Sequence, residues 1–222
     1  MYFIVNIIFN KKLLEIKFKI NISFQLYFFF EFMAKRLSFK NFIENMDFYI
    51  QEALNNKIFV YPTDTVYGIW AIQTPENIIK IAKIKQRDPK QLMSVIVPDF
   101  NHIIENWELK IENLSQFQNK TDEEVIRFLK IFFDKYHWVT YIFDYKISWT
   151  RIIKHDFQKF VEKLNKQFIS TSLNISWTEV IRDLKNMPKE IKSQVDYIID
   201  DGTLSWKPSV LIDFVADKVI ER

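Results

Sequence analysis

From Ser38 onward, apolar residues recur at spacings that alternate between those of a helix and those of a strand. Six apolar positions between residues 39 and 54 share one helical face, and Ser38 precedes them as an N-cap, so the pattern predicts one amphipathic helix. The apolar run at 58–60 predicts a strand. Thr74 and Pro75 then supply a cap and a first-turn proline for a helix that ends near Lys85.

The rest of the chain continues this alternation. Residues 121–124 have the spacing of a capping box and open a helix that carries an apolar stripe to residue 133. A loop is expected at 113–120 and further helices at 157–164 and 179–185; the expected strands are 93–97, 139–143, 168–174, 195–199, 210–214 and 218–220. Strands alternating with helices, followed by closing strands, predict an α/β (α+β) fold around one twisted mixed sheet.

Residues 1–32 are rich in Phe and Ile, but we expect no membrane span there. Six charged residues interrupt the segment, and its longest uncharged run, 20–30, is only eleven residues long, too short to cross a bilayer. Features of a secretory signal peptide are also missing. The sequence at Met33 is typical of a protein start, so we expect 1–32 to be an upstream extension and 33–222 to be a single domain.

Composition excludes several classes of site. With no Cys among the 222 residues, the chain has no disulfide, no thiolate nucleophile and no Cys-based zinc site, which agrees with a cytoplasmic protein that has no membrane partner. Three scattered His residues show no metal-ligand spacing. The net charge of +3 is a mild basic excess that fits either a phosphate-bearing ligand or RNA.

The segment from Tyr61 to Gly68 is Tyr-Pro-Thr-Asp-Thr-Val-Tyr-Gly. Just after a predicted strand, it presents the hydroxyls of Thr63, Thr65 and Tyr67 and the carboxylate of Asp64. Small ligands commonly bind at such strand ends in open α/β sheets. We expect Gly68 to adopt a backbone conformation that other residues avoid. Taken alone, so short a motif is more typical of a solvated turn.

Three other groups could contact an anionic ligand. Lys85 and Arg87, just past a helix, can bracket a phosphate or carboxylate, although charged residues at a helix end are more often surface groups. Ser172 and Asn174 share one face of an extended segment, or alternatively cap a turn. Arg151, with His155 four residues later, is another candidate anion clamp; alternatively, Arg151 is exposed and His155 caps a helix. These groups predict a concave, basic, hydroxyl-rich pocket.

Taken together, these segments resemble the signatures of the YrdC-like family, the threonylcarbamoyl-AMP synthases of transfer RNA modification. The resemblance covers roughly residues 58–222 and is carried by order and spacing rather than by any single motif. The matching segments are Pro-Thr-Asp-Thr-Val-Tyr-Gly at 62–68, Lys85 with Arg87, Val139-Thr140, Arg151 to His155, Thr-Ser-Leu-Asn-Ile-Ser-Trp at 171–177, and Lys-Pro-Ser at 207–209.

The resemblance implies a nucleotidyltransferase of the short, single-domain type. L-threonine and bicarbonate would give an N-carboxylated amino acid that attacks the α-phosphate of ATP, releasing pyrophosphate, with Mg²⁺ accompanying ATP. The labile product would pass to a threonylcarbamoyl-transferase complex that forms t6A37 in tRNA. By resemblance, Lys85 and Arg87 are catalytic; Lys85, Arg87, Thr140, Asn174 and Arg222 bind ATP; and Thr63 or Thr65, Arg151, Ser172 and Ser209 bind L-threonine.

Tryptophan stands at positions where the family signatures or turn chemistry favour glycine: Trp70, Trp138, Trp149, Trp177 and Trp206. The chain has only two glycines, whereas average usage of about 7% would give roughly fifteen. We therefore hypothesise that UGA codons of an AT-rich genome encode Gly but were translated as Trp. Leu173 and Ile153 are further departures from the signatures, where Ala and Pro are usual.

Two other functions remain open. The first is an RNA-binding module without catalysis, which would use a basic concave face to hold tRNA or double-stranded RNA. The second is a carbamoyl-transfer domain of hydrogenase maturation, although the acylphosphatase and zinc-finger segments that usually accompany such a domain are missing.

Overall fold

The computed structural model describes residues 34–106, 117, 119–136, 139–144, 148–205 and 209–221. The helices are α2 (Phe39–Glu44), α3 (Met46–Leu54), α4 (Pro75–Lys85), α5 (Phe100–Asn106), α6 (Asp122–Lys135), α7 (Gln158–Leu164) and α8 (Lys189–Lys192). The strands are β1 (Lys35–Ser38), β2 (Phe59–Tyr61), β3 (Gly68–Ile72), β4 (Ser94–Ile96), β5 (Val139–Asp144), β6 (Ser148–Arg151), β7 (Phe168–Ser172), β8 (Tyr197–Asp200), β9 (Val210–Asp213) and β10 (Lys218–Ile220).

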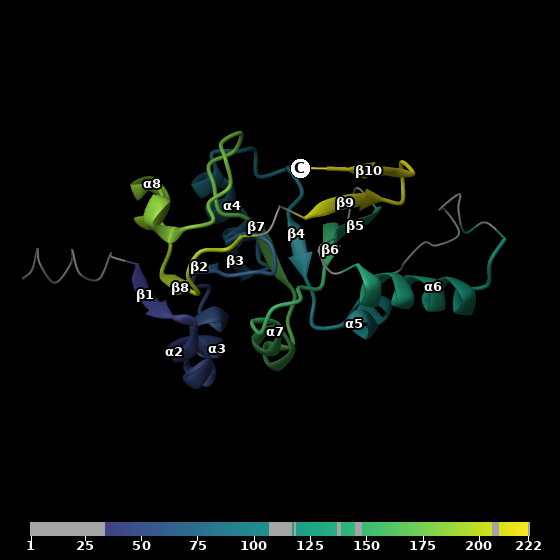
Figure 1. Ribbon diagram of the computed structural model, residues 1–222, viewed down its shortest axis with the longest axis horizontal. Coiled ribbons are helices and arrows are strands. Elements are labelled where there is room, and N and C mark those ends of the chain that lie inside the picture. The colour runs from purple at the N-terminus through teal and green to yellow at the C-terminus, as the bar shows by residue number, and fades with distance from the viewer. Residues whose placement is uncertain are drawn as a thin grey trace, which may run out of the picture.

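These strands form one mixed sheet in the order β1-β8-β2-β3-β7-β4-β6-β5-β9-β10. The sheet runs from β1 and β8 at one end of the molecule to β9 and β10 at the other (Figure 1). The sheet is mixed: β8 pairs parallel with both β1 and β2, whereas β3 pairs antiparallel with both β2 and β7. The predicted α/β fold with a twisted mixed sheet is confirmed.

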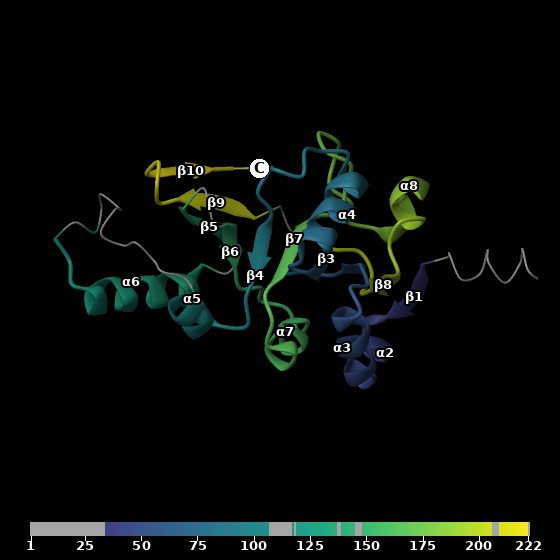
Figure 2. The ribbon, with the colours of Figure 1, turned by 180° about the vertical axis from the view of Figure 1, so that it is seen from behind.

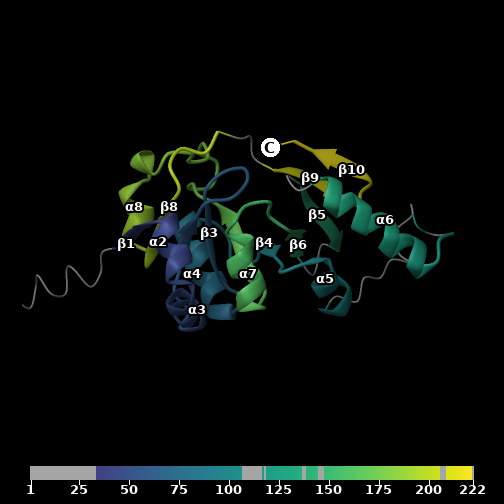
Figure 3. The same cartoon turned by 60° about the horizontal axis from the view of Figure 1, so that its bottom comes forward.

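Helices cover both faces of the sheet because the inner strands are apolar on both sides. In β3, Ile69 and Ala71 face the core that holds α4, α5 and α6, whereas Trp70 faces the aromatic core that holds α2, α3 and α7. The view from behind shows α4 beside β3 and β7 (Figure 2), and Figure 3 shows α7 near the middle of the sheet with α6 at its far end. No helix in the described ranges has the length and apolar character needed to span a bilayer.

Two helix predictions are wrong. The segment 39–54 forms two helices instead of one, because Asn45 leaves helical geometry (φ −117°, ψ 29°) and ends α2 while its side-chain amide donates to the Asn41 carbonyl oxygen at 2.9 Å. The helix expected at 179–185 is absent: this stretch is irregular up to a 3₁₀ turn at Leu184–Asn186, and α8 begins only after Pro188. Asp183 caps that 3₁₀ turn instead of continuing a helix.

Strand register brings polar residues together near the centre of the sheet. Tyr61 pairs with Gly68, which pairs with Ser172. One step along, Ser170 on β7 pairs with Ser94 on β4. Since side chains alternate with period two, Ser94 lies on the same face as Ile96, and Ser170 on the same face as Phe168, which is the face of the aromatic core. This face carries the pocket.

Candidate functional site

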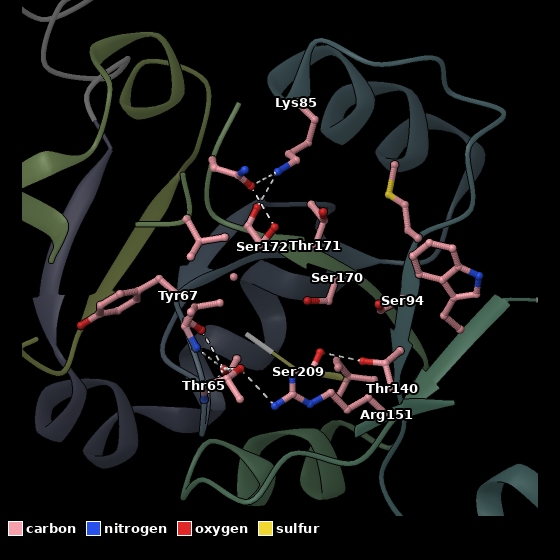
Figure 4. A pocket seen from close by; sticks show the side chains of 18 of the residues that line it. Thr65, Tyr67, Lys85, Ser94, Thr140, Arg151, Ser170, Thr171, Ser172 and Ser209 are labelled. Atoms are coloured by element: carbon pink, nitrogen blue, oxygen red, sulfur yellow. Dashed lines mark hydrogen bonds between the residues drawn. The ribbon is translucent and has the colours of Figure 1, made fainter. Parts of the chain in front are cut away.

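A pocket of about 610 Å³ opens on this face, between the ends of β2, β4, β6 and β7 and the segment that follows α4. Its lining includes three cations, Lys85, Arg87 and Arg151, and no carboxylate among the described residues. Hydroxyl-bearing side chains provide most of the other polar groups. Lys85 lies at one end and Arg151 at the other, with Ser170 between them (Figure 4). Such a lining favours an anionic, hydrogen-bonding ligand.

At one end of the pocket, the Lys85 side chain is hydrogen-bonded to the C-terminal end of β7 and the residues that follow it. The Lys85 ammonium donates to the carbonyl oxygen of Ser172 at 2.7 Å and to Oδ1 of Asn174. Oδ1 of Asn174 also accepts from the Ser172 hydroxyl at 2.8 Å, and its Nδ2 donates to the Thr178 carbonyl oxygen at 2.7 Å. Two of the three ammonium hydrogens are therefore committed to neutral oxygens, and one remains for a ligand.

Burial makes the charges at this end costly. Desolvation, followed by repulsion from Arg87, lowers the pKa of Lys85 to about 7. Desolvation also lowers the pKa of Arg87, whose Nε and Nη2 atoms are buried without a hydrogen-bond partner in the described structure. Two desolvated cations without a counter-ion are expected where an anion binds, because the anion supplies the missing charge.

The opposite end is built around a buried ion pair between Arg151 and Asp64. Nη2 of Arg151 donates to Oδ1 of Asp64 and, at 3.2 Å, to Oγ1 of Thr65. The side chains of Arg151 and Asp64 are 8% and 12% exposed. Arg151 and Thr65 line the pocket, whereas Asp64 is not part of the lining.

The hydroxyl of Thr63 holds the turn that carries Asp64. Thr63 Oγ1 accepts from the backbone N–H groups of Thr65 and Val66, at 3.1 and 3.2 Å, and donates to the Val66 carbonyl oxygen at 2.7 Å. Because a hydroxyl has a single hydrogen, the 3.0 Å contact between the two threonine hydroxyls leaves Thr65 as the donor. Thr65 thus retains acceptor capacity toward the pocket.

Tyr61 and Ser170 occupy the middle of the pocket, their hydroxyl oxygens 2.7 Å apart. Burial raises the pKa of Tyr61 to about 12, so the phenol stays protonated at neutral pH. The Tyr61 ring lies against Gly68, where a Cβ atom would come within 2.4 Å of its Cε1 atom. The φ of Gly68 is not in the left-handed region, so our expectation about its backbone was wrong: glycine is needed there for ring contact.

Two tryptophans also line the pocket. Trp177 is 98% exposed and has φ +69°, in the region that favours glycine. The indole N–H of Trp149 is buried and finds no acceptor in the described structure. The indole N–H of the core residue Trp70 is also buried without an acceptor in the described structure, although the Trp70 ring stacks on Phe59 with 4.4 Å between ring centroids.

Comparison with known proteins gives the family. The family model Sua5_yciO_yrdC, described as "Telomere recombination", matches residues 52–132 and 151–222, more than half of the chain. The chain belongs to the Sua5/YciO/YrdC family. This confirms the resemblance to YrdC-like proteins. A protein of Methanocaldococcus jannaschii with the provisional name threonylcarbamoyl-AMP synthase is 29% identical over 185 residues, which cover 79% of this chain and 83% of that protein.

Several solved structures share the fold. Escherichia coli YciO matches with a TM-score of 0.64 at 18% identity, covering 85% of this chain and 94% of that one. Pyrococcus abyssi Sua5 complexed with L-threonine matches with a TM-score of 0.57 at 18% identity, covering 82% of this chain and 53% of Sua5. HypF, in its phosphate- and nucleotide-bound form, matches at 0.54 and 11% identity over 78% of this chain and 28% of its own.

The family fold brings nearly all of the predicted site residues to one pocket. Ser172 lies with Lys85 and Asn174, and Ser209 lies 3.0 Å from the Thr140 hydroxyl. The predicted residues that line the pocket are Thr63, Thr65, Lys85, Arg87, Thr140, Arg151, Ser172, Asn174 and Ser209. Arg222, Trp138, Trp206 and residues 1–32 lie outside the described residues.

The suggested clamp of Arg151 with His155 is wrong. His155 Nε2 lies 3.1 Å from an Asp201 carboxylate oxygen, and His155 is not part of the pocket lining. Ser94 and Ser170 also line the pocket but were not among the predicted site residues; both lie within apolar strands. A serine that interrupts such a run on a buried face was the available signal.

Candidate metal ligands are not clustered in the described part of the chain. The part of the chain that the structure describes contains no group of three or more His, Asp or Glu side chains able to hold a metal.

Proposed function

We propose that this protein is an L-threonylcarbamoyladenylate synthase, a nucleotidyltransferase that makes threonylcarbamoyl-AMP and pyrophosphate from L-threonine, bicarbonate and ATP. The observation that carries the proposal is a pocket with cations at both ends and no carboxylate in its described lining. One end suits a polyphosphate and the other suits a carboxylate. The relative named as a threonylcarbamoyl-AMP synthase and the L-threonine complex of Sua5 support the same pairing of substrates.

The residues act by positioning and charge neutralisation. The free hydrogens of Lys85 and Arg87 bind the phosphates of ATP, and Mg²⁺ bound to those phosphates neutralises further charge. Arg151 binds the threonine carboxylate. The threonine amine and bicarbonate form a carbamate with loss of water. An oxygen of this N-carboxylate then attacks the α-phosphorus, and the bond to the pyrophosphate oxygen breaks. No nucleophilic side chain is required, because the substrate supplies the attacking oxygen.

Pyrophosphate release tests this proposal. Purified protein receives ATP, Mg²⁺, bicarbonate and L-threonine, and pyrophosphate is measured with and without threonine. We expect threonine-dependent release that falls at least tenfold in Arg87→Ala. The control variant is Arg127→Ala, on the exposed face of α6 outside the pocket lining, which should retain activity. Release that is independent of threonine would contradict the proposal.

The product would serve t6A37 formation in tRNA through a downstream threonylcarbamoyl-transferase complex. RNA binding without catalysis is the competing function. In that case tRNA or double-stranded RNA would bind tightly, with strong salt dependence, and no threonine-dependent pyrophosphate would form. A carbamoyl-transfer role like that of hydrogenase maturation would instead show ATP turnover with carbamoyl phosphate in place of threonine.

A further inference from the structure

Some hydrogen-bond donors of the Arg151 guanidinium have acceptors in the described structure, and others do not. Nη2 has two hydrogens, and both are used: one goes to Asp64 and one to Oγ1 of Thr65. Nε is buried and has no acceptor, and for Nη1 the described structure shows no hydrogen bond either. The open hydrogens of Arg151 therefore lie away from Asp64, on a residue that lines the pocket.

Asp64 is itself held by a rigid turn. The Thr63 hydroxyl closes this turn through contacts with the backbone of Thr65 and Val66, and it also accepts from the Thr65 hydroxyl. Both partners of Nη2 thus belong to one three-residue segment. A planar guanidinium has little rotational freedom when one of its nitrogens donates hydrogen bonds to two acceptors on the same rigid turn.

We propose that Asp64 is a positioning residue: by gripping Nη2 together with Thr65, it turns the remaining guanidinium donors of Arg151 toward the carboxylate of the amino-acid substrate. This inference rests on the proposed function, since it assigns the carboxylate to L-threonine. Asp64 acts through Arg151 and does not line the pocket, so it touches no substrate. The position of the Asp64 acceptor oxygen, rather than the negative charge of the carboxylate, orients Arg151.

Two substitutions separate geometry from charge. Asp64→Asn keeps an acceptor oxygen at the same distance from the backbone but removes the charge, whereas Asp64→Glu keeps the charge and displaces the oxygens by one methylene. Steady-state pyrophosphate release gives KM for threonine and for ATP separately. We expect Asp64→Glu to raise KM for threonine at least tenfold with KM for ATP within twofold, and Asp64→Asn to stay within about threefold of wild type for both.

The control is Asp196→Asn, which alters an ion pair with Lys57 (3.1 Å) outside the pocket lining and should leave both constants unchanged. Three results would overturn the inference: Asp64→Asn impaired more than Asp64→Glu, both KM values rising together, or neither variant changing KM for threonine. Inactivity of the wild type would instead mean that the proposed function has failed. If either variant is folded but too destabilised for kinetics, the rise in its melting temperature on adding threonine gives the same comparison from binding.

Discussion

Trp177 has a backbone conformation that its side chain opposes. Its φ of +69° places it in the left-handed region with Asn56, Gln86, Asn165 and Asp217, but it alone of these carries an indole. That conformation costs an L-residue about 1–2 kcal/mol, and a side chain that is 98% exposed recovers little by packing. Trp177→Gly should therefore raise the free energy of unfolding by about 1 kcal/mol, measured by urea denaturation. Trp177→Ala, which keeps a Cβ atom, should gain clearly less; equal gains would contradict the backbone argument.

The same residue bears on the genetic code of the source. Trp149 also lines the pocket with an unpaired indole N–H, and only two glycines occur in 222 residues. We expect the codons for residues 149 and 177 to be UGA and the native protein to carry Gly there, which peptide mass spectrometry would detect. Trp70 differs from these two residues, because its ring fills the aromatic core and a glycine in its place would leave a large cavity. UGG at 149 and 177 would refute the hypothesis.

Lys85 should make stability and ligand binding depend on pH. Its pKa is lowered to about 7 by burial, whereas the unfolded chain has the ordinary value of 10.5. Between these values the unfolded state binds more protons, so the free energy of unfolding should rise as pH increases from 7 to 10. Lys85→Met should be more stable than wild type at pH 6, and its advantage should shrink toward pH 10. Lys83→Met, on the exposed face of the same helix, should show no such trend.

Elements with local signals were predictable from the sequence, and elements fixed by tertiary pairing were not. The capping box of α6 is present, with Glu124 N–H donating to Thr121 Oγ1 at 3.3 Å and Thr121 N–H donating to Glu124 at 2.8 Å. By contrast, β6 was missed because Ser148–Arg151 has no apolar run, and β3 was missed although its residues 69–72 form one directly after Gly68. Both strands depend on neighbours on each side of them in the sheet.

The pairing of β2 with β3 should fail if Gly68 gains a side chain. A Cβ at Gly68 would collide with the Tyr61 ring at 2.4 Å, and that ring cannot move without breaking the 2.7 Å contact between Tyr61 and Ser170. Gly68→Ala should therefore lower the free energy of unfolding by about 1–3 kcal/mol. Gly202→Ala is a useful comparison, because its φ of +78° costs backbone strain in open space. Activity after correction for folded protein should fall only in Gly68→Ala.

For the whole molecule, the pocket residues could be predicted but not their partners. Lys85 and Ser172 are 87 positions apart, as are Asp64 and Arg151, and each pair meets only through sheet order. Motifs revealed which polar groups sit at strand ends, since those groups interrupt an apolar pattern. They could not show that Arg151 forms an ion pair with Asp64, because strand order has no local signature in the sequence.

Because Lys85 and Arg87 have no counter-ion in the described structure, ligand binding at their end of the pocket should be coupled to the stability of the whole fold. An anion that binds only the folded state adds about 2.7 kcal/mol at a hundredfold excess over Kd, and pyrophosphate fits the end that holds Lys85 and Arg87. The melting temperature should rise with pyrophosphate concentration, and the rise should shrink with added salt, which screens the charges. Arg87→Ala should lose most of the shift, whereas Arg127→Ala should keep it. An equal shift in both variants would show that pyrophosphate acts at the surface and would remove the phosphate assignment from Arg87.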